Sequence, residues 1–187
     1  AHYHKKILIF IPGDSDQSLK IPHSIVFRHS QYRYKIQANE IIMPAYIDDL
    51  GEECGSAPLS KGSSPKVGFC GWATAPTVQQ MLIYRTKLLY AQLRQYGLGD
   101  PHALVRRKGL WFRQQALRLL TAKTSDIETD FIIRKSYSVH EKTRRGDQGE
   151  LRQAFIDNVR RTHYTLAVKG DGNYSQRFFE ALSLGRT

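Results

Sequence analysis

Short apolar runs along this chain predict β-strands at five places. Two of them, Ile7–Ile11 and Ser24–Phe27, lie in the first third of the sequence. Three more follow at wider intervals: Lys66–Cys70, Asp130–Arg134 and Thr165–Val168. Apolar runs of about four to eight residues, closed by glycine or polar residues, are typical of buried strands.

Between these runs, apolar residues recur at helical spacing. In Thr77–Tyr96 they fall near every third or fourth position, and glycines end the pattern. Asp100 is placed to cap the next helix, with Pro101 in its first turn, and we expect this helix to reach about Leu120. Two further helices are predicted: one from the stripe Leu151, Phe155 and Val159, and one over Ser175–Leu184.

From Pro65 onward, the predicted strands alternate with helices. This order predicts an α/β fold, with a Rossmann-like parallel sheet flanked by helices and right-handed crossovers between strands. Ligands of such sheets bind outside the carboxyl ends of the strands. We expect that edge to carry Gly71–Trp72, Arg134–Ser136 and Lys169–Ser175, so that two basic clusters and two glycine turns share it.

The segment Asp48–Ser64 is rich in glycine, serine and acidic residues, which indicates a loop or an inter-domain linker. It divides the chain into residues 1–64 and residues 65–187. The sequence starts with alanine and stops where a helix should pass to a further strand. We therefore expect the second part to be a Rossmann-like domain that is incomplete at its C-terminus.

Charge narrows the range of partners. A net charge of +11 favours nucleic acid, acidic lipid or phosphorylated small molecules, with a solvated basic face as the alternative. No apolar run approaches the roughly 20 residues that span a bilayer. Cys54 and Cys70 make neither a disulfide framework nor a metal site, and they indicate reduced, intracellular thiols.

The glycine loop near the C-terminus is the strongest candidate site. Gly170 and Gly172 allow positive φ and a close approach of the backbone to a ligand, and Ser175 is a good N-cap for the helix that follows. The N-terminus of a helix attracts phosphate. Arg177 and Glu180 share one face of that helix, where Arg suits a phosphate and Glu suits a ribose diol.

Two other interpretations of this loop stay open. It can be a tight turn before a helix with an ordinary Arg–Glu pair, and the charge of Asp171 counts against a phosphate. The spacing Gly170-x-Gly172-x-x-Ser175 also matches the dinucleotide fingerprint weakly, but it follows the third strand of the unit rather than the first.

Several stretches together resemble the exostosin-like glycosyltransferases. Asn158 and the run Tyr164–Arg186 match the family signature, an apolar strand followed by R/K-G-x-G-N-x-S-x-R-F-Y-E-x-L-x-x-G-R and then P-V. Pro65–Gly71, Asp130–Arg134 and Asn39–Pro44 are also similar to family members. The C-terminal motif is specific, and the upstream pieces are weaker.

The resemblance implies a GT-B architecture, with residues 1–64 as the end of the acceptor-side domain and the crossover, and residues 65–187 as the nucleotide-sugar-binding domain. It implies transfer of a sugar from a UDP or GDP donor to a glycan hydroxyl, usually with inversion, without a cofactor and often without metal. Arg177 would stabilise the leaving diphosphate. The donor-binding residues that it implies are Gly71, Arg134, Lys169, Gly170, Gly172, Asn173, Ser175, Arg177 and Glu180.

The chain departs from the family pattern at some points. Phe179 stands where tyrosine is usual, and the expected Pro-Val strand is missing. An inverting transferase needs a general base, and the sequence does not identify one. His140, Glu141 and Asp147 are expected to be solvated loop residues, and the seven histidines show no metal-ligand spacing.

Other functions remain open from the sequence. Val105–Lys108 and Lys142–Arg145 favour a nucleic-acid-binding domain, although the aromatic residues do not group with them. A dinucleotide-dependent oxidoreductase and an inactive remnant that only binds the donor are further alternatives. The basic residues between Arg85 and Arg118 are candidates for peripheral contact with an acidic membrane. The expected compartment is a bacterial-type cytoplasm, with the Golgi lumen as the alternative.

Overall fold

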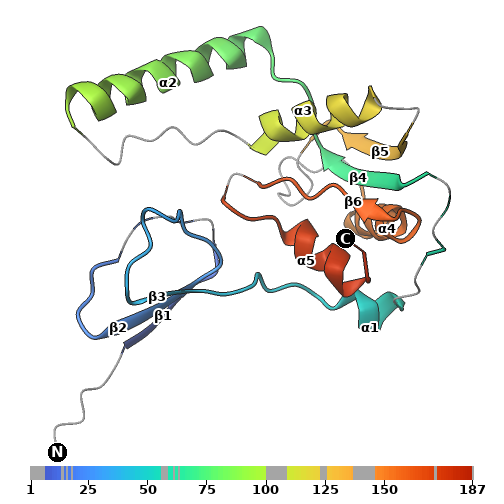
Figure 1. Ribbon diagram of the computed structural model, residues 1–187, viewed down its shortest axis with the longest axis horizontal. Helices are drawn as coiled ribbons and strands as arrows, with labels where there is room; N and C mark the ends of the chain where they lie inside the picture. The colour runs from blue at the N-terminus through green and yellow to red at the C-terminus, as the bar shows by residue number, and fades with distance from the viewer. Residues whose placement is uncertain are drawn as a thin grey trace, which may run out of the picture.

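The protein is an α/β structure with two small parallel sheets and helices around them (Figure 1). The computed structural model describes residues 7–13, 15, 17, 19–55, 59–60, 62, 64–99, 109–122, 126–136, 146–170 and 172–186. The α/β class predicted from the alternation of strands and helices is confirmed.

The N-terminal sheet contains three parallel strands in the order β1-β2-β3. Its strands are β1 (Ile7–Ile11), β2 (Ser24–Arg28) and β3 (Glu40–Ile42). The two strands predicted in this region are confirmed. The short strand β3 was not predicted, because three residues beside a polar loop give too little periodicity to recognise.

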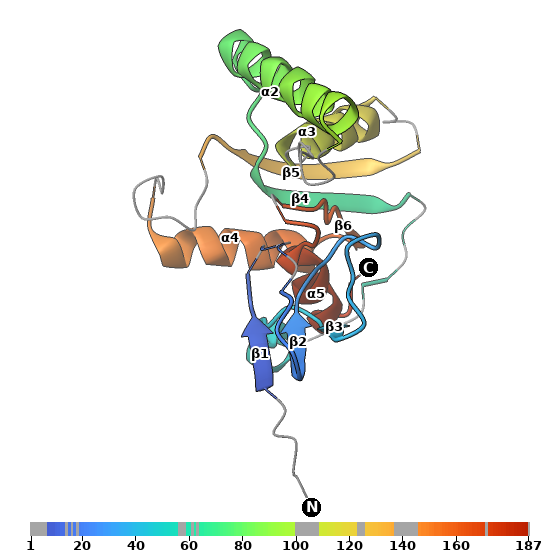
Figure 2. The same cartoon turned by 90° about the vertical axis from the view of Figure 1, so that its left-hand side faces the viewer.

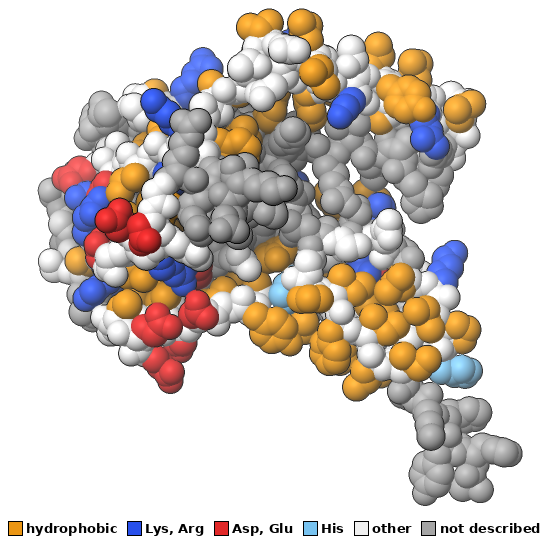
Figure 3. All heavy atoms as spheres, turned by 180° about the vertical axis from the view of Figure 1, so that it is seen from behind, with side chains coloured by type: hydrophobic (Ala, Val, Ile, Leu, Met, Phe, Trp, Pro, Cys, Tyr) orange, Lys and Arg blue, Asp and Glu red, His pale blue; other side chains and the backbone are white. Residues whose placement is uncertain are grey.

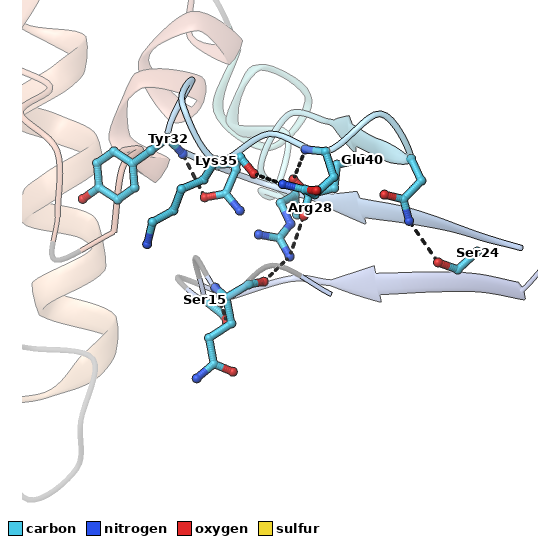
Figure 4. Close-up of polar contacts among 10 residues, drawn as sticks. Ser15, Ser24, Arg28, Tyr32, Lys35 and Glu40 are labelled. Atoms are coloured by element: carbon cyan, nitrogen blue, oxygen red, sulfur yellow. Dashed lines mark hydrogen bonds and ion pairs between the residues drawn. The ribbon is translucent and has the colours of Figure 1, made fainter. Parts of the chain in front are cut away.

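A buried ion pair links β2 to β3 inside this sheet (Figure 4). Nη2 of Arg28 lies 3.3 Å from Oε1 of Glu40, and both side chains are completely buried. Arg28 also donates a hydrogen bond of 2.9 Å to the carbonyl oxygen of Gln17, and Glu40 accepts one of 3.1 Å from the backbone N–H of Gln37. These contacts fix the two loops that surround the carboxyl end of β2.

The second sheet is also parallel and has the order β5-β4-β6. It contains β4 (Lys66–Trp72), β5 (Glu128–Arg134) and β6 (Tyr164–Thr165). The three predicted strands are present, although β6 ends three residues earlier than expected. Because β5 and β6 flank β4 on opposite sides, the order of strands reverses at β4, which makes its carboxyl end a topological switch point.

Helices cover both faces of the second sheet. Figure 2 shows α2 (Val78–Gly97) and α3 (Gly109–Thr121) on one face, and α4 (Gln148–Arg160) and α5 (Gln176–Ser183) on the other. The predicted helices are confirmed, except that the expected start at Asp100 and Pro101 lies outside the described residues. A capping box of Thr77 and Gln80 starts α2.

Asp147 was expected to be a solvated loop residue, and it is exposed and lies in the loop just before α4. Its carboxylate accepts hydrogen bonds from the backbone N–H groups of Gly149 (2.7 Å) and Glu150 (3.1 Å), so it is the N-cap of α4. His140 and Glu141, which were grouped with it, lie outside the described residues.

The segment expected to be a loop or linker contains the short helix α1 (Leu50–Cys54). Its Leu50 is fully buried in the main core with residues of β4, α4 and α5: Cys70, Phe155, Ile156, Val159, Ala181 and Leu184. On the opposite face of the sheet, a smaller core joins Phe69, Ala73 and Leu117. The connection after the N-terminal sheet is therefore packed against the second sheet.

The close approach of α4 to the second sheet depends on Gly68. A Cβ atom at this position would lie 2.6 Å from Oγ1 of Thr162 and 2.9 Å from Oδ1 of Asn158. Asn158 is completely buried, and its Nδ2 donates a hydrogen bond of 2.9 Å to the carbonyl oxygen of Asp130. Asn158 therefore has a structural function, because it joins α4 to β5.

Candidate functional site

Arg177, in the first turn of α5, lies at the carboxyl end of β4. Its guanidinium carbon is 5.1 Å from the ring centroid of Phe69, and a Cβ atom at Gly71 would overlap the guanidinium group. Only glycine at position 71 leaves room for this arrangement. The Nη1 atom of Arg177 is buried and has no hydrogen-bond partner among the described residues.

An unpartnered guanidinium nitrogen in a buried position is costly, because it has lost water without gaining an acceptor. Burial is the largest cause that lowers the pKa of Arg177, to about 10, and the positive charge of Arg113 lowers it further. Since that pKa is still well above 7, Arg177 carries its charge at neutral pH. A charged donor without a partner favours an anionic ligand at this position.

Two further arginines approach the same strand end. Arg113 of α3 donates from Nη1 to the carbonyl oxygen of Trp72 at 3.3 Å. Arg134, at the end of β5, donates from Nη2 to the Sγ atom of Cys70 at 3.2 Å and to the carbonyl oxygen of Leu151. Both arginines lower the pKa of Arg177, so the three positive charges act on one another.

Cys70 lies beside these arginines on β4. Burial is the main cause that raises the pKa of its thiol, against the opposing effect of Arg134 and Arg177. The thiol is therefore neutral at pH 7 and does not balance the charge of the arginines. The arginine cluster, defined as Arg113, Arg134 and Arg177, is a basic centre at the switch point of the sheet.

The glycine loop lies next to this cluster. Gly170 does not use the positive φ that glycine allows, and its N–H donates to the carbonyl oxygen of Tyr174 at 3.1 Å. A Cβ atom at Gly170 would be 3.9 Å from Nη2 of Arg113, an ordinary contact. The more restrictive glycine is Gly109, where a Cβ atom would overlap the carbonyl oxygens of Lys169 and Gly170.

The start of α5 lacks the cap that the sequence predicted. Ser175 has the extended backbone of an N-cap residue, with φ −133° and ψ 120°, but its hydroxyl group makes no capping hydrogen bond. Gly172 is buried within this loop, and Asp171 lies outside the described residues. The serine hydroxyl caps none of the first N–H groups of α5, and of these the N–H of Phe178 donates to the backbone carbonyl oxygen of Ser175 at 3.2 Å. N–H groups at a helix start that lack a side-chain cap are suited to an anion.

Three of the predicted donor residues have other partners in the structure. Oε1 of Glu180 accepts a hydrogen bond of 2.5 Å from Nη1 of Arg152, which also lies 3.5 Å from Asp48. The Nζ atom of Lys169 lies 5.9 Å from the ring centroid of Phe112 on α3. The third, Asn173, donates from Nδ2 to the carbonyl oxygen of Gln31 at 3.4 Å.

The contact of Asn173 brings the carboxyl end of the N-terminal sheet to the glycine loop. A run of buried polar residues follows β2 there, namely His29, Ser30 and Gln31. The imidazole of His29 lies edge-on to Tyr46 and Tyr174, with ring centroids 5.3 Å and 5.6 Å away. Both its ring nitrogens are buried and lack a hydrogen-bond partner in the part of the chain that the structure describes.

Sequence reasoning therefore found Gly71, Arg134 and Arg177, which the structure brings together, but it missed Arg113 and His29. Arg113 is one of two arginines on α3 and gives no local signal. His29 had a usable signal, because it belongs to a polar run just after the strand predicted at Ser24–Phe27.

These features define an α/β protein with an arginine-lined site at the carboxyl edge of a parallel sheet. No protein-family model, curated protein or solved structure was found to match the chain. Within the described ranges, no helix is long and apolar enough to cross a membrane. Those ranges also contain no group of three or more His, Cys, Asp or Glu side chains arranged to hold a metal ion.

Proposed function

We propose that this chain carries the donor site of a glycosyltransferase that moves a sugar from a nucleoside diphosphate sugar to a hydroxyl group of a glycan. The observation that carries the proposal is the buried guanidinium of Arg177, held over Gly71 at the switch point, with Nη1 unpartnered in the described structure. The resemblance of Tyr164–Arg186 to the exostosin-like signature supports the same assignment.

The arginine cluster fits the chemistry of a leaving diphosphate. When the bond between the sugar and the diphosphate breaks, negative charge grows on the departing phosphate oxygen. Fixed cations and uncapped N–H groups that are already in place stabilise this charge without further reorganisation. Arg177 and the start of α5 are positioned for this task, and Arg113 and Arg134 keep the surrounding potential positive.

The rest of the donor site follows from the same placement. The diphosphate would lie against Gly170, Gly172 and Ser175, with UDP or GDP as the carrier. Contact of Glu180 with the ribose would use Oε2, because Arg152 already binds Oε1. The proposed architecture is of GT-B type, with the N-terminal sheet on the acceptor side, and the proposed compartment is a bacterial-type cytoplasm, with the Golgi lumen as the alternative.

We assign the general base of an inverting transfer to His29. Its imidazole lies in contact with Tyr174 of the glycine loop, and its two nitrogens lack a described partner. A neutral ring nitrogen in that position can accept the proton of the acceptor hydroxyl as the sugar is transferred. His29 lies on the acceptor-side sheet and the arginine cluster on the donor-side sheet, so each sheet supplies one chemical function.

Calorimetric titration with UDP, GDP and NAD tests the donor site. We expect one of the two diphosphates to bind and Arg177→Ala to weaken it by about 1.5–3 kcal/mol, roughly tenfold to a hundredfold in Kd. Arg118→Ala, which removes an exposed arginine from the last turn of α3, is the matched control and should leave the Kd unchanged. Binding of NAD alone would instead favour an oxidoreductase.

A further inference from the structure

The helix α2 presents two different apolar faces. One face packs toward α3: the ring centroids of Tyr84 and Trp111 are 5.2 Å apart, and Ala91 is buried. The other face points to solvent, and its residues form the outer stripe, defined as Val78, Leu82, Leu89, Leu93 and Tyr96. Each of these side chains is more than half exposed, from 58% for Leu82 and Leu89 to 81% for Tyr96.

The spacing of the outer stripe is that of one helix surface. At 3.6 residues per turn, its five members fall within about 60° of arc along the whole length of α2. A helix of 20 residues is about 30 Å long, so the stripe follows one side of α2 along its length, with Arg85 on the same side between Leu82 and Leu89. Figure 1 shows α2 projecting at the top of the molecule, above α3.

The two helices of this layer carry only basic charges. The residues of α2 and α3 include five Lys or Arg side chains and no Asp or Glu, in a protein whose net charge is +11. Every charged residue of α2 is basic, namely Arg85, Lys87 and Arg94. In Figure 3, hydrophobic and basic side chains lie along the top of the molecule, and the visible acidic side chains lie lower.

We propose that α2 is a membrane-surface helix that seats its outer stripe in an anionic lipid bilayer. Amphipathic helices with basic flanks lie in the plane of the interface and bury their apolar face about 5–10 Å below the headgroups. Arg85, Lys87 and Arg94 would contact the acidic headgroups, each attracted by the negative surface potential. Tyr96, with an apolar ring and a polar tip, suits the same interface.

The outer stripe and the basic residues of α2 together favour a bilayer over the other candidate partners. Nucleic acid would be recognised by the basic residues, but it gives no reason for the exposed apolar side chains of the outer stripe. A second copy of this chain would cover the leucines, but it would bring a second strongly positive layer against the first. An anionic bilayer complements both the charge and the apolar ridge.

The test is co-sedimentation of the whole chain with vesicles of equal parts phosphatidylglycerol and phosphatidylcholine, compared with pure phosphatidylcholine. We expect binding to the anionic vesicles that weakens as salt is raised. Leu89→Glu/Leu93→Glu should lower the partition coefficient at least about tenfold, because it places two negative charges on the ridge. Arg85→Gln/Arg94→Gln should also lower it about tenfold or more.

The control variant introduces the same change of charge in the N-terminal sheet. Leu8→Glu/Ile41→Glu introduces two glutamates at exposed apolar positions of β1 and β3, and it should leave vesicle binding unchanged. All variants are compared at equal folded fraction, measured by circular dichroism. The titration with nucleoside diphosphates does not depend on vesicle binding. The donor-site proposal and the membrane proposal can therefore fail independently.

Three results would overturn the proposal. The first is equal affinity for anionic and neutral vesicles, or no binding to either. The second is an equal loss of binding in the stripe variant and in the control. The third is binding to random RNA, or a dimer dissolved by Leu89→Glu/Leu93→Glu, in a chain that does not bind the anionic vesicles.

Discussion

Arg177 and His29 present the same problem at the scale of single residues. Each has buried side-chain nitrogen atoms without a described hydrogen-bond partner, and each lies at the carboxyl end of a parallel strand. Folded proteins rarely leave such groups unsatisfied, because each costs about 1–3 kcal/mol. A ligand that accepts from Nη1 of Arg177 would remove the first cost, and one that donates to the acceptor nitrogen of His29 would remove part of the second.

If His29 is the general base, substituting it should change the rate of sugar transfer but not the affinity for the donor. His29→Gln should leave the Kd for the nucleoside diphosphate unchanged and lower the rate of sugar transfer by about 10²–10⁴. The rate is measured with a panel of glycan acceptors and with the donor that the titration identifies. A variant that transfers sugar at the wild-type rate would show that another group takes the proton.

His23→Gln is the matched control for this experiment. His23 lies before β2, whereas His29 follows it, so the same chemical change is made at the opposite end of one strand. We expect His23→Gln to leave the transfer rate within about twofold of wild type, since the carboxyl end of the strand is the end that binds ligands.

At the scale of elements, β4 combines close packing on one face with the candidate site at its end. Gly68 admits Asn158 of α4 and Thr162 just beyond the end of that helix, and Gly71 admits the guanidinium of Arg177. Two glycines three residues apart on one buried strand therefore have different purposes. The first positions a helix, and the second positions a functional side chain.

The close contact at Gly71 predicts that one added methyl group there will weaken ligand binding. Gly71→Ala should displace Arg177 and weaken nucleoside diphosphate binding at least about tenfold, because the charge-assisted hydrogen bond is lost. Calorimetry on the folded variant measures this change. Gly97→Ala is the control, since a Cβ atom there would meet nothing within 4 Å. Unchanged binding in Gly71→Ala would mean that Arg177 does not hold the ligand from this position.

The ion pair between β2 and β3 predicts an effect on stability. Arg28→Met leaves the buried carboxylate of Glu40 alone and should lower the free energy of unfolding by about 3–5 kcal/mol. The double variant Arg28→Met/Glu40→Leu removes both charges and should recover much of that loss. Urea denaturation of the two variants measures the difference, and equal stability would contradict the buried-pair explanation.

At the scale of the whole molecule, the sequence predicts more of the fold than of the site. Apolar runs and helical stripes are local, so they located β4, β5, α2, α4 and α5. The strand β3 and the helix α1 were missed because their few residues gain stability from packing against distant segments. Leu50, for example, is buried only because α4 and α5 cover it.

The site depends on contacts that local patterns do not contain. Arg113 reaches the strand end from α3, and Arg152 binds Glu180 from α4, so both contacts join segments distant in sequence. The sequence allowed a positive φ at Gly170, but residue type shows only what a glycine permits, and the structure does not use it there. The structure uses the small size of Gly71 and Gly109 at their close contacts.

Two parallel sheets meet where their carboxyl ends face one shared loop. Asn173 and Tyr174 belong to the glycine loop of the second sheet, and they contact Gln31 and His29 beyond the first. The donor and acceptor parts of the proposed reaction therefore meet at this loop. The helix α2, which carries the proposed membrane contact, lies on the other side of the second sheet, beyond α3 (Figure 2).

A crystal structure of the chain with saturating UDP, and a second one with GDP, tests the central claim most directly. The account predicts a diphosphate oxygen within about 2.7–3.2 Å of a guanidinium nitrogen of Arg177, at the carboxyl end of β4 and the start of α5. A diphosphate bound elsewhere, or crystals at saturation in which Arg177 still packs over Gly71 without a ligand, would contradict it.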